Sequence, residues 1–342
     1  MKCLLCKENE ADETGSHILT HSLISNCINE QGKKGRNKEM MFGISQSGER
    51  KLFVGNQVLP DKIVEIKGRE LSDQEVENND NDLVVDNIYC KDCERLFGRI
   101  ESEFSRKILG KIRRDKIYDF TNPDNILIRL YFYIQVWRAS SFKYTEWSLP
   151  NCIEEPLREI ILEGCTNYDI GISAELEDKI IKIPIIINYL DTPDEKSSSN
   201  LIFIPNETLP YLLFLCDFVV EFFTVQGVMP SLHSISNYNG LNDNLSEQFI
   251  NLNENRFKLR CISDSNREKI INSFSLNEIG LIDLDRIKKS FVFEYLKSKK
   301  TFPTLNQFLR FMFEFSKWDK LPLLEQMSEQ RISNLIKKII KE

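Results

Sequence analysis

Two short stretches of sequence decide the fold, MKCLLC at residues 1–6 and IYCKDCERLF at residues 88–97. Each contains a C-x-x-C pair, and the four cysteines are Cys3, Cys6, Cys90 and Cys93. Two such turns, each presenting two thiolates, can complete a tetrahedral zinc site. We therefore expect one structural Zn²⁺, with buried reduced cysteines in one or both pairs as the alternative. A thioredoxin-like redox role is disfavoured because no expected strand precedes Cys3.

The length of 342 residues favours two domains, and we expect a small module over residues 1–115 and a larger domain over 116–342. Hydrophobic residues make up 41% of the chain, enough for an ordinary core, so wholesale disorder is excluded. Nine cysteines are an odd number for a disulfide framework, and we recognise no signal peptide ahead of Cys3. A reducing, cytoplasmic location is therefore expected.

The net charge of −7 argues against a chain that coats nucleic acid by bulk attraction, although a local basic patch could still bind phosphates. The most apolar stretch, Leu209 to Thr224, is shorter than the roughly 20 residues that a spanning helix needs. It also contains Asp217 and Glu221. We interpret it as core, either helix or strand, and expect no membrane partner.

Hydrophobic periodicity predicts a mixed α+β chain. Before residue 90, Met40–Ser45 and Lys51–Val54 should pair as a β-hairpin around the turn at residues 46–49. Strands are expected at Ile180–Tyr189 and Asn200–Ile204, which are rich in β-branched residues. Helices are expected over residues 90–111, 124–141, 153–162, 284–297, 305–317 and 323–340.

Histidine is scarce in this chain, and two of its three histidines are His17 and His21. Their four-residue spacing would place both on one face of a helix, where they could share a metal. His17 lies in the tripeptide Ser16-His17-Ile18. The third, His233, is interpreted as a surface residue in a loop.

These motifs resemble the zinc-knuckle HNH, or His-Me finger, endonucleases, and more narrowly an uncharacterised bacterial group. The resemblance is carried by the early C-x-x-C, Ser16-His17-Ile18, the hairpin near Gly48, and Cys90 to Glu94 leading into a helix. A Trp-Arg-Ala-Ser segment at residues 137–140 also matches, so the resemblance covers residues 1 to about 140. It implies a zinc-bound, ββα-like module of treble-clef type and leaves the remainder unassigned. The sequence pattern of the remainder predicts a mixed α/β domain for recognition of a partner, a ligand or nucleic acid.

The resemblance further implies hydrolysis of DNA or RNA phosphodiester bonds. His17 would be the general base that activates water, and Mg²⁺ or Mn²⁺ would stabilise the charge on the scissile phosphate. The family usually has histidine directly after the last cysteine, where this chain has Glu94. A carboxylate suits a hard cation, and Asn87 or Asp86 would orient the base or the ion. The alternatives are a His17 bonded to a zinc-bound sulfur and a Glu94 that is an ordinary helix residue.

Basic residues beside this expected site would bind the nucleic acid backbone. The expected contacts are Lys33, Lys34, Arg36, Arg95 and Arg99, with Lys38 nearby and further basic residues toward Arg114. The alternative is that these residues are ordinary solvent-exposed charges on the surface of a helix. Arg129 and Arg138 interrupt an apolar helix, and buried charges must be paired. We expect their partners among Glu146, Glu154 and Glu155.

The first hypothesis is thus a metal-dependent, HNH-like nuclease. The family resemblance places it in bacterial defence against phage, where a partner protein of the defence system would be expected. The second hypothesis is a non-catalytic, zinc-stabilised module that binds nucleic acid or protein, in which His17 has a structural role.

Overall fold

The computed structural model describes residues 1–12, 15–23, 40–44, 50–54, 70, 72–74, 84–142, 148–191, 201–203, 211–223, 256–274, 280–317 and 329–341. The chain divides into two compact units, and both are discontinuous in sequence. Unit 1 is Met1–Lys34 with Asn81–Ser273, and unit 2 is Gly35–Asp80 with Phe274–Glu342. The expected α+β character is confirmed. The boundary expected near residue 115 instead falls inside unit 1, because the helix before it packs against the helices after it.

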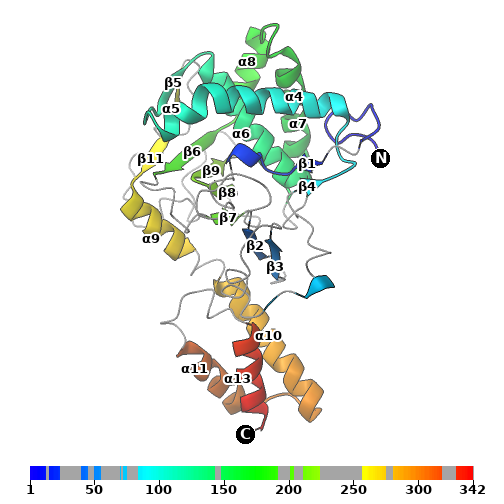
Figure 1. Ribbon diagram of the computed structural model, residues 1–342, viewed down its shortest axis with the longest axis vertical. Coiled ribbons are helices and arrows are strands. Elements are labelled where there is room, and N and C mark those ends of the chain that lie inside the picture. Colours follow the sequence, from blue (N-terminus) through cyan, green and yellow to red (C-terminus); the bar gives the residue numbers. More distant parts are fainter. Residues whose placement is uncertain are drawn as a thin grey trace. The chain divides into compact units, whose positions relative to one another are not determined.

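A five-stranded sheet forms one layer of unit 1 (Figure 1). Its order is β11 (Arg260–Ile262), β6 (Ile185–Leu190), β9 (Phe218–Phe222), β8 (Tyr211–Cys216) and β7 (Leu201–Phe203). The β11–β6 pair is parallel and the other pairs are antiparallel. The apolar run that sequence left as helix or strand therefore forms the β8–β9 hairpin. Among the described residues, no helix is both long and apolar enough to cross a membrane.

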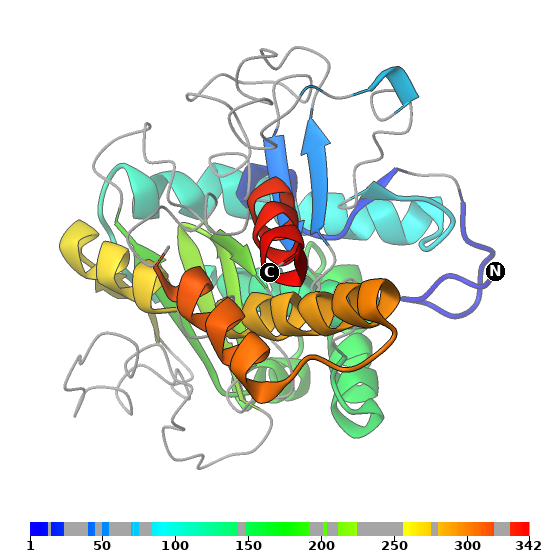
Figure 2. The same cartoon turned by 90° about the horizontal axis from the view of Figure 1, so that it is seen from below.

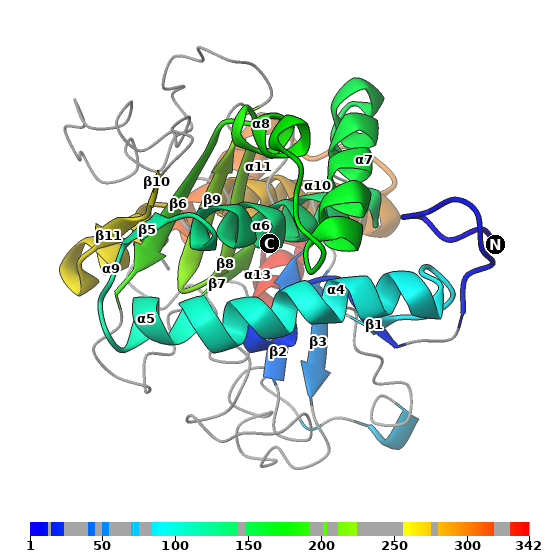
Figure 3. The same ribbon diagram turned by 90° about the horizontal axis from the view of Figure 1, so that it is seen from above.

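Helix α6 (Asp124–Ser141) is the centre of unit 1, and all its residues from Asn125 to Ser140 are buried. On one side, Tyr131 stacks on Phe104 of α4 (Lys91–Phe104) with ring centroids 3.7 Å apart. On the other side, Phe132 contacts Phe218 of β9 at 5.6 Å. Such burial explains why the α6 sequence is nearly continuously apolar instead of amphipathic. The helix thus lies between α4 and the sheet (Figure 3).

The other elements of unit 1 surround this centre. Helix α4 continues through the π-helical turn η3 (Ser105–Leu109) into α5 (Gly110–Arg113), which confirms a helix from about Cys90 to Lys111. The remaining elements are β1 (Ser16–His17), β4 (Val84–Val85), β5 (Asp119–Thr121), α7 (Asn151–Asn167), α8 (Ala174–Ile181), β10 (Arg256–Lys258) and α9 (Asp264–Phe274). Two small antiparallel pairs, β1–β4 and β5–β10, complete the unit.

The strand expected over Ile180–Tyr189 is wrong at its start. Ile180 and Ile181 end α8, and β6 begins at Ile185. Helix α8 is capped at its N-terminus by Ser173, whose hydroxyl oxygen accepts a hydrogen bond from the Leu176 N–H at 3.2 Å. A β-branched pair at a helix end is tolerated because the buried face and the cap outweigh its weak helix propensity.

Unit 2 contains the β2–β3 hairpin, Met40–Ile44 with Arg50–Val54, whose antiparallel register confirms the predicted pairing. It also contains α10 (Gly280–Lys299), α11 (Leu305–Ser316) and α13 (Glu329–Lys341), close to the three helices expected there. Helix α13, red in Figure 2, packs against both others. Stacked rings of Phe291 and Phe311, 4.3 Å apart, lie in their common core. The predicted turn at 46–49 lies outside the described residues.

Substitution of Gly164 tests the packing of α7 on α6. A Cβ at this position would lie 2.6 Å from Cδ2 of Leu130, which is itself fully buried, so the Leu130 side chain must shift within the core. We expect Gly164→Ala to destabilise unit 1 by about 1–3 kcal/mol, measured by urea unfolding with zinc present. The matched control is Gly98→Ala in α4, where nothing lies within 4 Å of the new Cβ. That change should stabilise by about 0.5–1 kcal/mol, and equal effects of the two would contradict close α6–α7 packing.

Candidate metal centre

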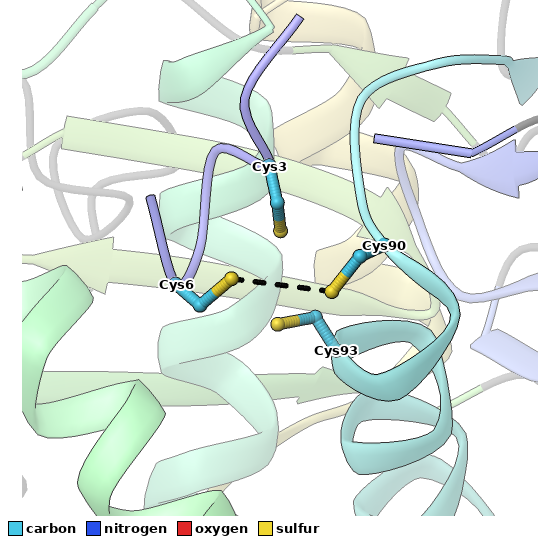
Figure 4. A group of neighbouring side chains, drawn as sticks. All are labelled: Cys3, Cys6, Cys90 and Cys93. Atoms are coloured by element: carbon cyan, nitrogen blue, oxygen red, sulfur yellow. Dashed lines mark hydrogen bonds between the residues drawn. The ribbon is translucent and has the colours of Figure 1, made fainter. Parts of the chain in front are cut away.

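The sulfur atoms of Cys3, Cys6, Cys90 and Cys93 all lie within 4.8 Å of one another. Figure 4 shows the four side chains pointing toward a common centre from two segments of the chain. None is in a disulfide, and only Cys6 is more than marginally exposed to solvent. The predicted proximity of the two C-x-x-C pairs is confirmed, and the four thiols could hold a metal ion such as zinc.

Each C-x-x-C segment, Cys3–Cys6 or Cys90–Cys93, is called a knuckle here, and each is a tight turn stabilised by backbone hydrogen bonds or by the start of a helix. In the first, the Cys3 N–H donates to the Asn9 carbonyl at 2.9 Å, and Lys7 closes the turn by donating to the Cys3 carbonyl. Lys7 has φ of +60°, a left-handed conformation that such a turn demands. In the second, Cys90 is the N-cap of α4 and Cys93 lies in its first turn. The start of α4 thereby positions one thiol pair.

Backbone hydrogen bonds join the two knuckles directly. Leu4 N–H donates to the Ile88 carbonyl and Asp12 N–H donates to the Tyr89 carbonyl, both at 2.9 Å. The Asp12 carboxylate accepts from the Lys91 N–H at 3.0 Å, at the N-terminal end of α4. A carboxylate is favourable there because it complements the positive end of the helix dipole. These contacts join residues 77 to 84 positions apart in sequence, and none of them depends on a metal.

Helix α7 supports the first knuckle from outside. The buried side chain of Arg158 donates to the Leu5 carbonyl, inside the C-x-x-C turn. Glu155 accepts hydrogen bonds from Arg158 at 2.7 Å and from Lys7 at 2.5 Å. These two cations lower the pKa of Glu155 to about 2. Residues beyond position 115 therefore contribute to the cysteine site.

The four thiols have different electrostatic surroundings. Burial raises the pKa of Cys3, and burial together with the neighbouring Cys3 raises the pKa of Cys93. Burial also opposes ionisation of Cys6, but hydrogen bonds from the backbone of Asn9 and Glu8 outweigh it and lower that pKa to about 7. Four thiolates this close repel one another. A bound divalent cation would remove that repulsion.

The Glu94 carboxylate is bonded to Ser16, the residue before His17. Ser16 and His17 form β1, which pairs antiparallel with Val85 and Val84 of β4. The buried Ser16 hydroxyl donates to the Glu94 carboxylate. Successive side chains of a strand point to opposite sides, so the His17 ring points away from Ser16. It lies beside the His21 ring instead, with centroids 5.9 Å apart.

A buried polar network holds the segment that follows His17. Arg138, only 2% exposed, donates to the His17 carbonyl at 3.1 Å and to the Glu101 carboxylate at 2.8 Å. Glu101 also accepts from the Thr20 hydroxyl at 2.9 Å. Gln135 exchanges hydrogen bonds with Thr20 through the Thr20 N–H and hydroxyl. Residues 16–20 are therefore fixed to both α4 and α6.

The partner expected for Arg138 is wrong. Arg138 pairs with Glu101 of α4, while Glu154 accepts from Ser140 and Glu155 from Arg158. Arg129 is held by Asn125 and by the Ile181 carbonyl, and its guanidinium lies 5.2 Å from the centre of the Phe257 ring. Arg138 is paired with a carboxylate, as expected for a buried charge, but that carboxylate belongs to Glu101 of the neighbouring helix α4. Glu146 lies outside the described residues.

The remaining predicted site residues are placed as follows. Asn87 is an exposed turn residue with φ of +60°, and its N–H donates to the Asp12 carbonyl. Arg95 pairs with Asp92 at 2.9 Å, and Arg99 pairs with Asp169 at 2.5 Å. Lys33, Lys34 and Arg36, as well as Lys38 and His233, lie outside the described residues.

Sequence reasoning missed Ser16 as the contact of Glu94 and Glu101 as the partner of Arg138. The signal for Glu101 was its position on α4, four residues after Phe97 and three before Phe104, both fully buried. A carboxylate so close to a buried helix face needs a buried donor. No comparable signal marks Ser16, because its bond depends on how β1 meets α4.

Comparison of the chain with protein-family models, with curated proteins and with solved structures yields no match.

Proposed function

We propose that Cys3, Cys6, Cys90 and Cys93 hold one structural Zn²⁺. The observation that carries this proposal is the convergence of four unpaired sulfurs within 4.8 Å. Four thiolates from two knuckles match the closed ligand set of structural zinc sites, which leaves no open position for a substrate. The metal would then serve to hold the N-terminal segment against the start of α4.

We further propose that this zinc-held region is an HNH-like ββα unit. The support is the order and pairing of its elements: β1 and β4 are antiparallel, and α4 follows β4 after five residues. His17 lies on the first strand, while Cys90, Cys93 and Glu94 lie at the start of the helix. The hairpin near Gly48, which also suggested the family, belongs to unit 2, so β1 and β4 take its place in the proposed ββα arrangement.

The activity we propose for this unit is metal-dependent hydrolysis of nucleic acid phosphodiester bonds. His17, half-buried on β1, would act as general base on water. Glu94 would hold a hard cation such as Mg²⁺ or Mn²⁺, which would stabilise the negative charge on the phosphate. The bond from Ser16 to Glu94 keeps that carboxylate at the β1–α4 junction, one residue from His17. Bacterial defence, with DNA or RNA as the substrate, remains the proposed setting.

A non-catalytic binding module is the second candidate, and a specific observation favours it. The Glu94 carboxylate is already engaged by Ser16, and the His17 side chain points to the other side of β1. Arg95 and Arg99 are engaged by acidic residues. In that case the zinc would stabilise a surface for nucleic acid or protein, and the activity assay below separates the two candidates.

Substitution of one cysteine tests the zinc site. Cys90→Ser removes one of four ligands from a buried position, so we expect bound zinc to fall from about one equivalent to near zero, measured by elemental analysis of the purified protein. Cys152→Ser is the matched control, since Cys152 is exposed and lies outside the cluster. Stoichiometric zinc in the Cys90 variant would rule out the four-cysteine site.

Substitution of His17 tests the nuclease proposal. Plasmid, single-stranded DNA and RNA are each incubated with the protein and Mg²⁺ or Mn²⁺. If His17 is the base, His17→Ala should slow cleavage about 100-fold or more while bound zinc stays unchanged. His21→Ala is the control for a neighbouring imidazole, and it should keep most of the activity.

Cleavage that survives in His17→Ala would disprove this role of His17. If no substrate is cleaved with either metal, the binding module is favoured. A mobility-shift measurement on the same nucleic acids then decides whether the module binds nucleic acid.

A further inference from the structure

Helix α11 of unit 2 carries apolar side chains on two faces. Its inner face packs into the helical core through Phe311, fully buried, with Phe308 and Met312 partly buried beside it. Its outer face carries Leu305, Leu309 and Phe313, which follow at four-residue steps and therefore share one side of the helix. A helix in contact with water on one side ordinarily places polar residues there.

The outer residues are strongly exposed. The exposed fractions are 71% for Leu305, 54% for Leu309 and 63% for Phe313, and Phe302, three residues ahead of Leu305, is 73% exposed. We call these four residues the apolar stripe. Single exposed apolar residues are common, but three on one side of a helix, with a fourth in the segment just before it, indicate a surface for binding.

The charges around the apolar stripe are predominantly positive. Five exposed basic residues lie within the stripe or close to one of its ends in sequence: Lys297, Lys299, Lys300, Arg310 and Lys317. The only acidic residue between positions 297 and 317 is Glu314, whose carboxylate is bonded to Lys317 at 2.5 Å. This local excess of positive charge occurs in a chain whose net charge is −7. The surface is therefore suited to an anionic partner.

We propose that the apolar stripe adsorbs to the surface of an anionic lipid bilayer. Phenylalanine and leucine side chains would enter the boundary between headgroups and acyl chains, and the flanking lysines would contact the negatively charged headgroups. The length of an apolar stretch limits whether it can span a bilayer, and it does not limit adsorption. Adsorption to a bilayer surface therefore needs no membrane-spanning helix, and the described residues contain none.

Other occupants fit this surface less well. A second copy would bring the same five cations against each other, and like charges at an interface are unfavourable. Nucleic acid would satisfy the cations and could stack on Phe302 or Phe313. Leu305 and Leu309 would gain nothing from phosphates or sugars, whereas an acyl-chain boundary stabilises all four residues.

Vesicle flotation with the full chain tests the proposal. Vesicles of phosphatidylcholine mixed with phosphatidylglycerol are compared with vesicles of phosphatidylcholine alone, and we expect co-flotation with the anionic vesicles. The variant Leu305→Gln, Leu309→Gln, Phe313→Gln should bind at least about tenfold more weakly. Glutamine keeps helix propensity at these exposed positions. Ile170→Gln is the matched control, because Ile170 is 81% exposed and lies in unit 1.

A second variant, Lys297→Gln, Lys299→Gln, Lys300→Gln, keeps the test decisive if the first one folds poorly. Each lost cation should weaken binding to anionic vesicles about fivefold at low salt. Equal binding to neutral vesicles, unchanged binding by both variants, or no co-flotation of the wild-type chain would each overturn the proposal. Two further results, obtained without vesicle binding, would also overturn it. One is a wild-type dimer that becomes a monomer in the Leu305, Leu309 and Phe313 variant, and the other is a DNA mobility shift that this variant loses.

Discussion

Convergence of sulfur atoms from two distant segments is the constraint on which the candidate site depends. The Cys6 and Cys90 sulfurs lie 3.9 Å apart although 84 residues separate them. Closing a loop of this length costs chain entropy, and the cost grows only slowly with length. The insertion between the two segments can therefore be long without much further cost. The two ends of the insertion must still be held together by interactions between the segments that flank it.

Those ends are held by two sets of contacts that do not share residues. The first is the backbone bonding between the knuckles, supported by Arg158 from α7. The second is the network of Arg138, Glu101, Thr20 and Gln135. A buried charged pair contributes only where its remaining donors and acceptors are satisfied. Here Glu101 accepts two hydrogen bonds, whereas the buried Nε of Arg138 has no hydrogen-bond partner among the described residues, and the guanidinium lies 4.1 Å from the centre of the Phe97 ring.

Local rules of sequence explain which features could be predicted. The C-x-x-C spacing places two sulfurs on one turn whatever surrounds it, so the cluster followed from residue types alone. The helices around Leu127 and Phe311 followed from apolar patterns and from breaks at proline. The β8–β9 hairpin did not, because a run that is buried throughout has no period to separate strand from helix.

Partners that depend on packing between elements could not be predicted in the same way. Arg138 was expected to pair with a glutamate near in sequence, yet Glu101 reaches it because α4 lies against α6. The division into two units was missed for a related reason, since the hairpin at 40–54 belongs with the C-terminal helices.

The position of β1 gives the two candidate functions a common physical basis. Strand geometry makes Ser16 and His17 face opposite ways, so one residue can tie β1 to Glu94 while the next presents an imidazole elsewhere. A nuclease would need a phosphate to lie where both the imidazole and the carboxylate act on it. A binding module would need only the rigidity that the Ser16–Glu94 bond and the Arg138 network supply. The bond that positions Glu94 engages only its Oε1 atom, so a nuclease would bind its cation through Oε2 while Ser16 holds the carboxylate in place.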